Sequence, residues 1–143
     1  MLSQKKGELH MKDLKASDVM VRPVVSAKAH ASARDVTLQV LSGLYSGMPV
    51  TDDEGKIIGI ITEIDLLQAV MEGKDLIKTT ADEIMAKDPI TADKDIPIIE
   101  LTKIMSEKDV IRIPITDNGR LCGIVARCDI LRTLLEPEFA TYM

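Results

Sequence analysis

Residues 48–67 read MPVTDDEGKIIGIITEIDLL, and residues 113–131 read IPITDNGRLCGIVARCDIL. Each stretch begins with apolar residues around a proline, passes through a polar turn that contains glycine, and continues as a second apolar run. This order is typical of a β-hairpin. Leucine and isoleucine then recur at helical spacing in both stretches. The chain therefore carries the same hairpin and helix twice.

The repetition extends upstream of both hairpins, at a spacing of 64 to 66 residues. An internal repeat of this kind has to be identified before any other feature is interpreted. Apolar residues at helical spacing predict a helix before each hairpin. A short extended segment is predicted earlier still, at Val24-Val25 in the first copy and at Ile90-Thr91 in the second. Each copy thus predicts the order β-α-β-β-α.

These patterns predict an α+β fold of two β-α-β-β-α repeats related by pseudo-twofold symmetry. A single unit of about 60 residues is marginally stable, so we expect the two copies to bury each other's sheet faces. Such pairing would leave clefts between the copies, where ligands often bind. The predicted segments are an N-terminal extension (1–16), the first repeat (17–72), a linker (73–80), the second repeat (81–136) and a C-terminal tail (137–143).

Composition limits the possible functions. The net charge of −5 argues against a nucleic-acid partner. Only 2% of the residues are aromatic, which is too few for base-stacking platforms. The N-terminus has no apolar stretch behind its lysines, and the longest apolar run, Ile57 to Ile61, is far too short to cross a membrane. Two cysteines, Cys122 and Cys128, are expected to be reduced, and we expect a cytoplasmic protein.

Catalytic signatures are missing from the sequence. It contains no phosphate-binding glycine loop, no zinc-protease motif and no nucleophile elbow. His10 and His30 stand apart from cysteines and acidic clusters, so a histidine base or metal site is poorly supported. Asp52-Asp53-Glu54 is interpreted as a solvated hairpin turn, with a divalent-metal site as the alternative. We therefore expect no enzyme, and a weak phosphohydrolase would lack metal ligands.

The repeated motif resembles a known family. The pattern P(V/I)TD, turn, GI(I/V), D(L/I)L, with VM or IM and a proline upstream, is similar to a tandem pair of CBS domains, the regulatory module named after cystathionine β-synthase. The resemblance covers about residues 17 to 136 and implies a stand-alone module. It implies regulatory binding of AMP, ADP, ATP or S-adenosylmethionine between the repeats, a homodimer and an effector protein. The alternative is a ligand-independent dimerisation or protein-interaction module.

The resemblance assigns Asp65 to ribose hydroxyls and Thr62 to ribose or phosphate. A carboxylate offers acceptors for the two donors of a vicinal diol, so the chemistry suits this role. The same spacing, Thr62-x-x-Asp65, is also a helix capping box. Both interpretations stay open at the level of sequence.

The second copy keeps Asp129 but has Ala126 in place of the capping hydroxyl. Ala126 weakens the prediction of a ligand site in the second copy and favours the interaction-module alternative. The two copies could also share one ligand, with Thr62 on a phosphate and Asp129 on the ribose. Arg112 and Arg127 are candidate phosphate ligands, with solvated or ion-paired arginines as the alternative. Residues expected beside the base are Val25 and Tyr45 in the first copy and Thr91 and Ile111 in the second, with Val24, Ile90 and Val110 as further neighbours.

Overall fold

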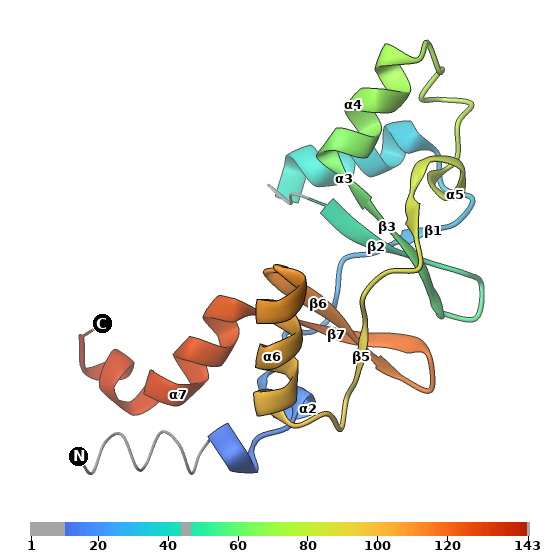
Figure 1. Cartoon of the computed structure of the whole chain (residues 1–143). Helices are drawn as coiled ribbons and strands as arrows, with labels where there is room; N and C mark the ends of the chain where they lie inside the picture. Colours follow the sequence, from blue (N-terminus) through green and yellow to red (C-terminus); the bar gives the residue numbers. More distant parts are fainter. Residues whose placement is uncertain (1–10, 44–46, 143) are drawn as a thin grey trace. The chain divides into compact units, whose positions relative to one another are not determined.

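The computed structural model describes residues 11–43 and 47–142, with side chains described as far as residue 135. The fold is α+β, as the sequence predicts (Figure 1). The helices are α2 (Ala16–Val19), α3 (Ala33–Gly43), α4 (Glu63–Met71), α5 (Ala81–Ile84), α6 (Ile98–Lys108) and α7 (Arg127–Tyr142). The strands are β1 (Ala27–Lys28), β2 (Gly47–Thr51), β3 (Ile57–Thr62), β4 (Ala86–Lys87), β5 (Ala92–Asp93), β6 (Arg112–Asp117) and β7 (Arg120–Ala126).

The chain forms two compact units, which we call unit 1 and unit 2. Unit 2 consists of Val25–Pro89 together with Gly119–Leu121, and unit 1 consists of the chain up to Val24, Ile90–Asn118 and the chain from Cys122 onward. The opening segment of the chain thus joins the second sequence repeat. The opening segment of the second repeat, with α5 and β4, joins the first.

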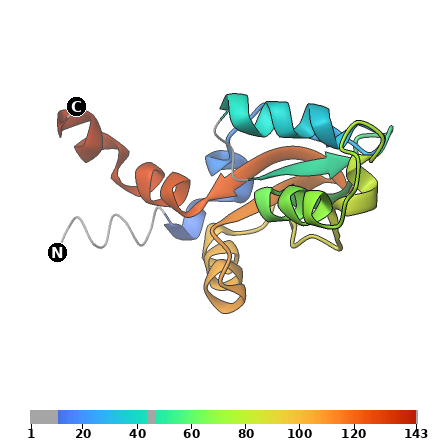
Figure 2. The ribbon, with the colours of Figure 1, turned by 90° about the horizontal axis from the view of Figure 1, so that it is seen from above.

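Unit 2 contains a four-stranded sheet in the order β1-β2-β3-β4. β1 is parallel to β2, whereas β3 pairs antiparallel with both β2 and β4. Helices α3 and α4 contact each other and are neighbours in both views of the chain (Figure 1 and Figure 2). Their inward side chains and those of the sheet form an aliphatic core, because the sequence supplies almost no aromatic residues. Its largest fully buried members are Val36, Met48, Val50 and Ile61.

Unit 1 repeats this arrangement with a sheet in the order β5-β6-β7, β5 being parallel to β6. The free edge of β7 is paired by Val21, whose N–H donates to the Ile124 carbonyl at 2.8 Å and whose carbonyl accepts from Ile124 N–H at 3.1 Å. The core is again aliphatic. Its largest fully buried members are Ile98, Leu101, Ile113, Ile115 and Val125.

The predicted hairpin turns are confirmed. Asp52 Oδ1 accepts hydrogen bonds from the backbone N–H groups of Glu54 and Lys56, both at 2.9 Å. The acidic cluster therefore shapes a turn, as the sequence predicts. In the second hairpin Asn118 and Gly119 have φ of 52° and 82°, the left-handed pair that a tight two-residue turn requires.

Short segments ahead of each repeat make equivalent backbone contacts in the two units. In unit 1, Ala16 N–H donates to the Ile96 carbonyl at 2.9 Å, and Ile98 N–H donates to the Leu14 carbonyl at 2.9 Å. In unit 2 the same pattern joins Ala81 N–H to the Ala31 carbonyl at 2.8 Å, and Ala33 N–H to the Thr79 carbonyl at 2.7 Å. Residues 14–16 and 79–81 are thus structural equivalents. The contacts extend the internal repeat into the segments predicted as N-terminal extension and linker.

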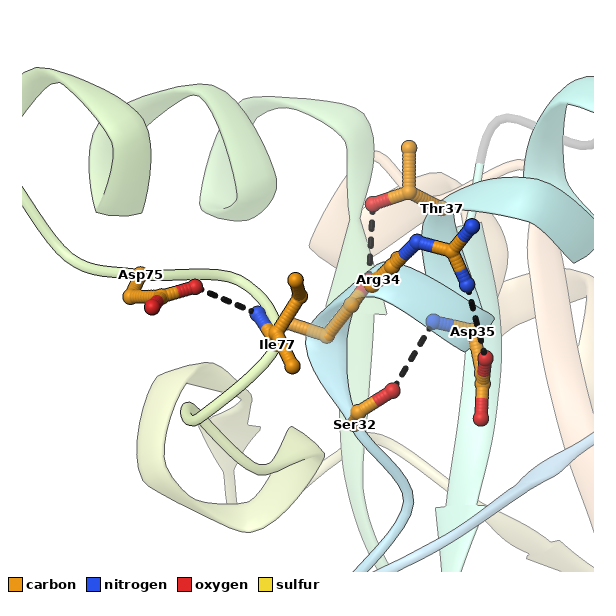
Figure 3. Close-up of polar contacts among 7 residues, drawn as sticks. Ser32, Arg34, Asp35, Thr37, Asp75 and Ile77 are labelled. Carbon is orange, nitrogen blue, oxygen red and sulfur yellow. Dashed lines mark hydrogen bonds and ion pairs between the residues drawn. The ribbon is translucent and has the colours of Figure 1, made fainter.

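The segment between the repeats also caps helix α3. Arg34 N–H donates to the Leu76 carbonyl at 3.0 Å, and Asp35 N–H donates to Ser32 Oγ at 3.1 Å. Asp75 holds the segment in shape by accepting from Ile77 N–H at 2.9 Å (Figure 3). These contacts satisfy N–H groups that the first turn of a helix cannot satisfy internally.

Two sequence predictions are wrong in detail. The extended segments fall at Ala27–Lys28 and Ala92–Asp93 rather than at Val24-Val25 and Ile90-Thr91, because only these residues reach the parallel edges of β2 and β6. The last helix runs to Tyr142, through most of the predicted C-terminal tail (137–143), although Pro137 removes a backbone donor from it.

Candidate functional site

Thr62 and Asp65 form a complete capping box at the start of α4. Thr62 Oγ1 accepts from Asp65 N–H at 3.4 Å, and Asp65 Oδ2 accepts from Thr62 N–H at 2.8 Å. The Thr62 hydroxyl also donates to Asp65 Oδ2 at 2.9 Å. The capping interpretation of this motif is therefore confirmed.

The capping contacts occupy one oxygen of the Asp65 carboxylate. Both donors from Thr62 converge on Oδ2, and among the described residues no group donates to Oδ1. Asp65 is also partly exposed to solvent. Capping and ligand binding are thus compatible on this side chain, since each oxygen of a carboxylate accepts up to two hydrogen bonds.

Gly47 lies opposite Thr62 in the β2–β3 pair. A Cβ atom at position 47 would lie 2.7 Å from the Ile61 carbonyl oxygen and 3.2 Å from Thr62 Cγ2. Gly47 therefore places no side chain beside Thr62, and a larger residue there would collide with the backbone of β3. In the second copy the corresponding residues are Arg112 on β6 and Ala126 on β7. The first strand of the hairpin thus carries the larger side chain in the second copy and none in the first.

The second copy keeps half of the capping box. Ala126 N–H donates to Asp129 Oδ2 at 2.8 Å, and the hydroxyl of Thr62 has no counterpart. Asp129 Oδ1 accepts from Arg132 Nη1 at 3.2 Å, so both oxygens of this carboxylate have protein partners. The Asp129 side chain is only 10% exposed. Sequence analysis missed Arg132, although its spacing of three residues from Asp129 in a helix was a usable signal.

Arg127 is the first residue of α7, and its side chain contacts the C-terminal end of α6. Its Nε donates to the Val110 carbonyl at 3.1 Å and its Nη2 to the Met105 carbonyl at 3.2 Å. Asp109, in the left-handed conformation at the end of the helix, lies 3.6 Å from the same Nη2. These contacts place a cation at the C-terminal, negative end of the helix dipole. They give Arg127 a structural role, and its predicted contact with phosphate stays a prediction.

The remaining predicted residues are distributed over both units. Arg112 begins β6 and is exposed, and the exposed Ile111 accepts a hydrogen bond from Arg127 N–H at 3.0 Å. Thr91 is half-buried in unit 1, and Val25 is 38% exposed in unit 2. Tyr45 lies outside the described residues.

The rest of the described chain shows few features typical of a functional site. Within residues 11–43 and 47–142, no three histidine, cysteine or acidic side chains come together in a group that could hold a metal ion. An open depression of about 480 Å³ lies beside β1 and α3, and none of the predicted site residues line it. No helix in the described part of the chain is long and apolar enough to cross a membrane.

Relatives from other organisms match most of this chain. Protein MK0525 of Methanopyrus kandleri is 32% identical over 129 residues, which cover 89% of this chain and 65% of MK0525. The L-aspartate semialdehyde sulfurtransferase of Methanocaldococcus jannaschii is 30% identical over 116 residues, which cover 80% of this chain and 22% of that enzyme. The chain thus spans less than two thirds of the length of these relatives.

A solved structure shows the same fold. The CBS domain pair of protein MJ0100, in complex with 5′-methylthioadenosine and S-adenosyl-L-methionine, superposes with a TM-score of 0.70 at 28% identity, covering 87% of this chain and 98% of that one. The family model described as CBS domain matches residues 16–72 and 81–136. On these grounds the chain belongs to the CBS domain family and contains two of its domains in tandem.

Proposed function

We propose that this chain is a regulatory module that binds an adenosyl compound, AMP, ADP, ATP or S-adenosylmethionine, and signals the bound state to a partner protein. The observation that carries the proposal is the carboxylate of Asp65. Its Oδ2 is fixed by two donors from Thr62 at 2.8 and 2.9 Å, and its Oδ1 accepts nothing from the described residues.

This geometry suits the ribose of an adenosyl compound. The 2′ and 3′ hydroxyls are adjacent donors, and Oδ1 has two lone pairs to receive them. The two capping contacts fix the rotamer of Asp65 in advance, so binding costs little side-chain entropy. Hydrogen bonds to an ionised carboxylate are also stronger than neutral ones.

The surroundings of Asp65 accommodate either a phosphate or a sulfonium side chain. The first turn of α4 presents backbone N–H groups, which favour an anion, together with the carboxylates of Glu63 and Asp65, which favour a cation. Gly47, opposite Thr62 in the β2–β3 pair, contributes no side chain of its own there. The CBS pair of MJ0100, 28% identical to this chain, was solved with S-adenosyl-L-methionine and 5′-methylthioadenosine, which supports the adenosyl class.

Thermal unfolding of the full chain with AMP, ADP, ATP and S-adenosylmethionine tests this function. A ligand present at a hundred times its Kd adds about 2.7 kcal/mol of stability. For a chain of this size that corresponds to a Tm increase of roughly 5–15 °C. GMP, which carries the same ribose phosphate on a different base, is the matched control.

The expected result is an increase with one or more adenosyl compounds that is smaller with GMP and is lost in Asp65→Ala. The same Tm with and without each compound would contradict the proposal. It would favour the alternative, an interaction module that needs no small ligand.

We also propose that the module acts as a homodimer. Helix α4 presents Ile64, Leu67 and Met71 along one stripe, with exposed fractions of 56%, 59% and 84%. α7 carries Leu131 and Leu135 at the positions equivalent to Leu67 and Met71, exposed by 61% and 51%. Each unit thus presents exposed apolar residues at the same place of its repeat, which a second copy can cover.

Light scattering coupled to size exclusion checks the dimer. Leu67→Lys combined with Met71→Glu should convert a dimer into a monomer, because charged side chains would be buried at the contact. Ile77→Lys is the control, since Ile77 is an equally exposed apolar residue outside the helices, at 67%. A monomeric wild-type chain would refute this part of the proposal.

A further inference from the structure

We infer that the two repeats are not equivalent as ribose sites, and that Arg132 makes the difference: the adenosyl ligand binds at Asp65 and not at Asp129. The inference rests on the proposed function and specifies which carboxylate performs it. It concerns two aspartates that occupy the same position of the repeat.

The two carboxylates differ in what their protein partners leave available. At Asp65 both capping hydrogen bonds go to Oδ2, so both lone pairs of Oδ1 are left for two hydroxyls. At Asp129 the contacts are divided, with Ala126 N–H on Oδ2 and Arg132 Nη1 on Oδ1. Neither oxygen of Asp129 can accept both hydroxyls of a vicinal diol without losing a protein donor.

Burial and charge reinforce this difference. The Asp129 side chain is 10% exposed, and its Oδ1 is paired with the 55% exposed side chain of Arg132. The guanidinium at 3.2 Å also neutralises the charge that would strengthen hydrogen bonds from a ribose. A ligand hydroxyl at Asp129 Oδ1 would therefore compete with Arg132 for that oxygen.

The sequence identifies the responsible residue. Asp65 and Asp129 share their position, and the residue three places further on is Gln68 in the first repeat and Arg132 in the second. Gln68 is exposed and donates no hydrogen bond to Asp65. Exchanging these two side chains should therefore exchange the properties of the two sites.

Isothermal titration of the full chain with AMP and with S-adenosylmethionine tests the inference. We expect one ligand per chain. Asp65→Asn should weaken binding at least about tenfold, because it weakens hydrogen bonds to a charged group. Asp129→Asn should change the Kd less than about threefold. Gln68→Arg should weaken binding by bringing a guanidinium to Asp65 Oδ1, and Gln68→Ala, the control for loss of the glutamine, should not.

The reciprocal variant, Arg132→Gln with Ala126→Thr, gives the second site the capping hydroxyl and the glutamine of the first, and should raise the stoichiometry from one to two. Loss of binding in Asp129→Asn, wild-type affinity in Gln68→Arg, or a stoichiometry that stays at one in the reciprocal variant would each overturn the inference while leaving the proposed function intact. No heat with any compound in any variant would instead refute the proposed function, and the inference with it.

Discussion

Met85 lies directly over Gly59, and a methyl group at position 59 would overlap its side chain. A Cβ atom there would lie 2.7 Å from Met85 Cγ, closer still to Sδ, and 2.8 Å from the Ala86 carbonyl oxygen. Met20 lies over Gly123 in the same way, with Cγ at 2.7 Å from the equivalent position. Each glycine thus packs against a methionine from the opening segment of the other sequence repeat. We call these two opening segments, each of which joins the unit of the other repeat, the exchanged segments.

Gly59→Ala should therefore destabilise the chain. Overpacking of this kind typically costs about 1–3 kcal/mol, and here Met85 and the backbone of β4 must both move. Chemical denaturation measures the loss in free energy of unfolding. In a double-mutant cycle, Met85→Ala should reduce the cost of Gly59→Ala, because it removes the overlapping atoms. Strictly additive effects would show that the two residues do not meet in this way.

The exchanged segments are predicted to be essential for folding. Ala16 and Ala81 are completely buried at equivalent positions of the two units. Ala16→Asp or Ala81→Asp would bury a carboxylate without a partner, at a cost of several kcal/mol against a total stability of about 5–15 kcal/mol. Circular dichroism should show loss of cooperative unfolding for either variant.

Ser17→Asp provides the matched control for this experiment. It places the same charge one residue further along, where the equivalent residue of unit 2 is the exposed Asp82. Its stability should stay within about 0.5 kcal/mol of wild type. Equal damage from Ser17→Asp and Ala16→Asp would mean that burial of position 16 is not the cause.

The capping boxes predict opposite effects in the two repeats. Thr62→Ala should cost about 1 kcal/mol, because Asp65 N–H loses its acceptor at the helix start. Ala126→Thr should add a similar amount, since it restores the absent hydroxyl to a box that already has its aspartate. Urea unfolding measures both changes. Destabilisation by Ala126→Thr would indicate that the second repeat has no room for the hydroxyl.

The two cysteines should differ in reactivity. Cys128 is exposed on the first turn of α7, whereas Cys122 is half-buried within 4.0 Å of Met20 Sδ. Burial, assisted by the charge of Asp117, raises the pKa of the Cys122 thiol. Because thiolate is the reactive form, iodoacetamide should label Cys128 well before Cys122 at neutral pH, as peptide mass analysis can measure. Faster labelling of Cys122 would contradict this.

The same raised pKa predicts an alkaline effect on stability. The folded chain holds the Cys122 proton more tightly than the unfolded chain does, so the contribution to stability is complete below the ordinary thiol pKa of about 8.5. It is lost as the pH rises from there through the raised value of the folded state. Cys122→Ser should remove this part of the pH dependence, and Cys128→Ser should not.

Local sequence patterns were enough for much of this protein. Both hairpin turns and the N-cap of α4 at Thr62 follow from residues within four positions of one another. The capping box and the turns at Asp52 and Asn118 are short-range hydrogen-bonding units, so their residue types determine them directly. The family resemblance has the same origin, because its motif consists of these local units.

Tertiary structure alone decided which segments complete which unit. Ala16 meets Ile96 across 80 positions of sequence, and Arg127 reaches back to Met105 at the end of α6. Such contacts depend on how apolar faces pack, and no local pattern encodes the choice of partner. The difference between Asp65 and Asp129 depends on both sequence and structure. The spacing from Asp129 to Arg132 was present in the sequence, but only the folded structure shows which carboxylate oxygen each donor occupies.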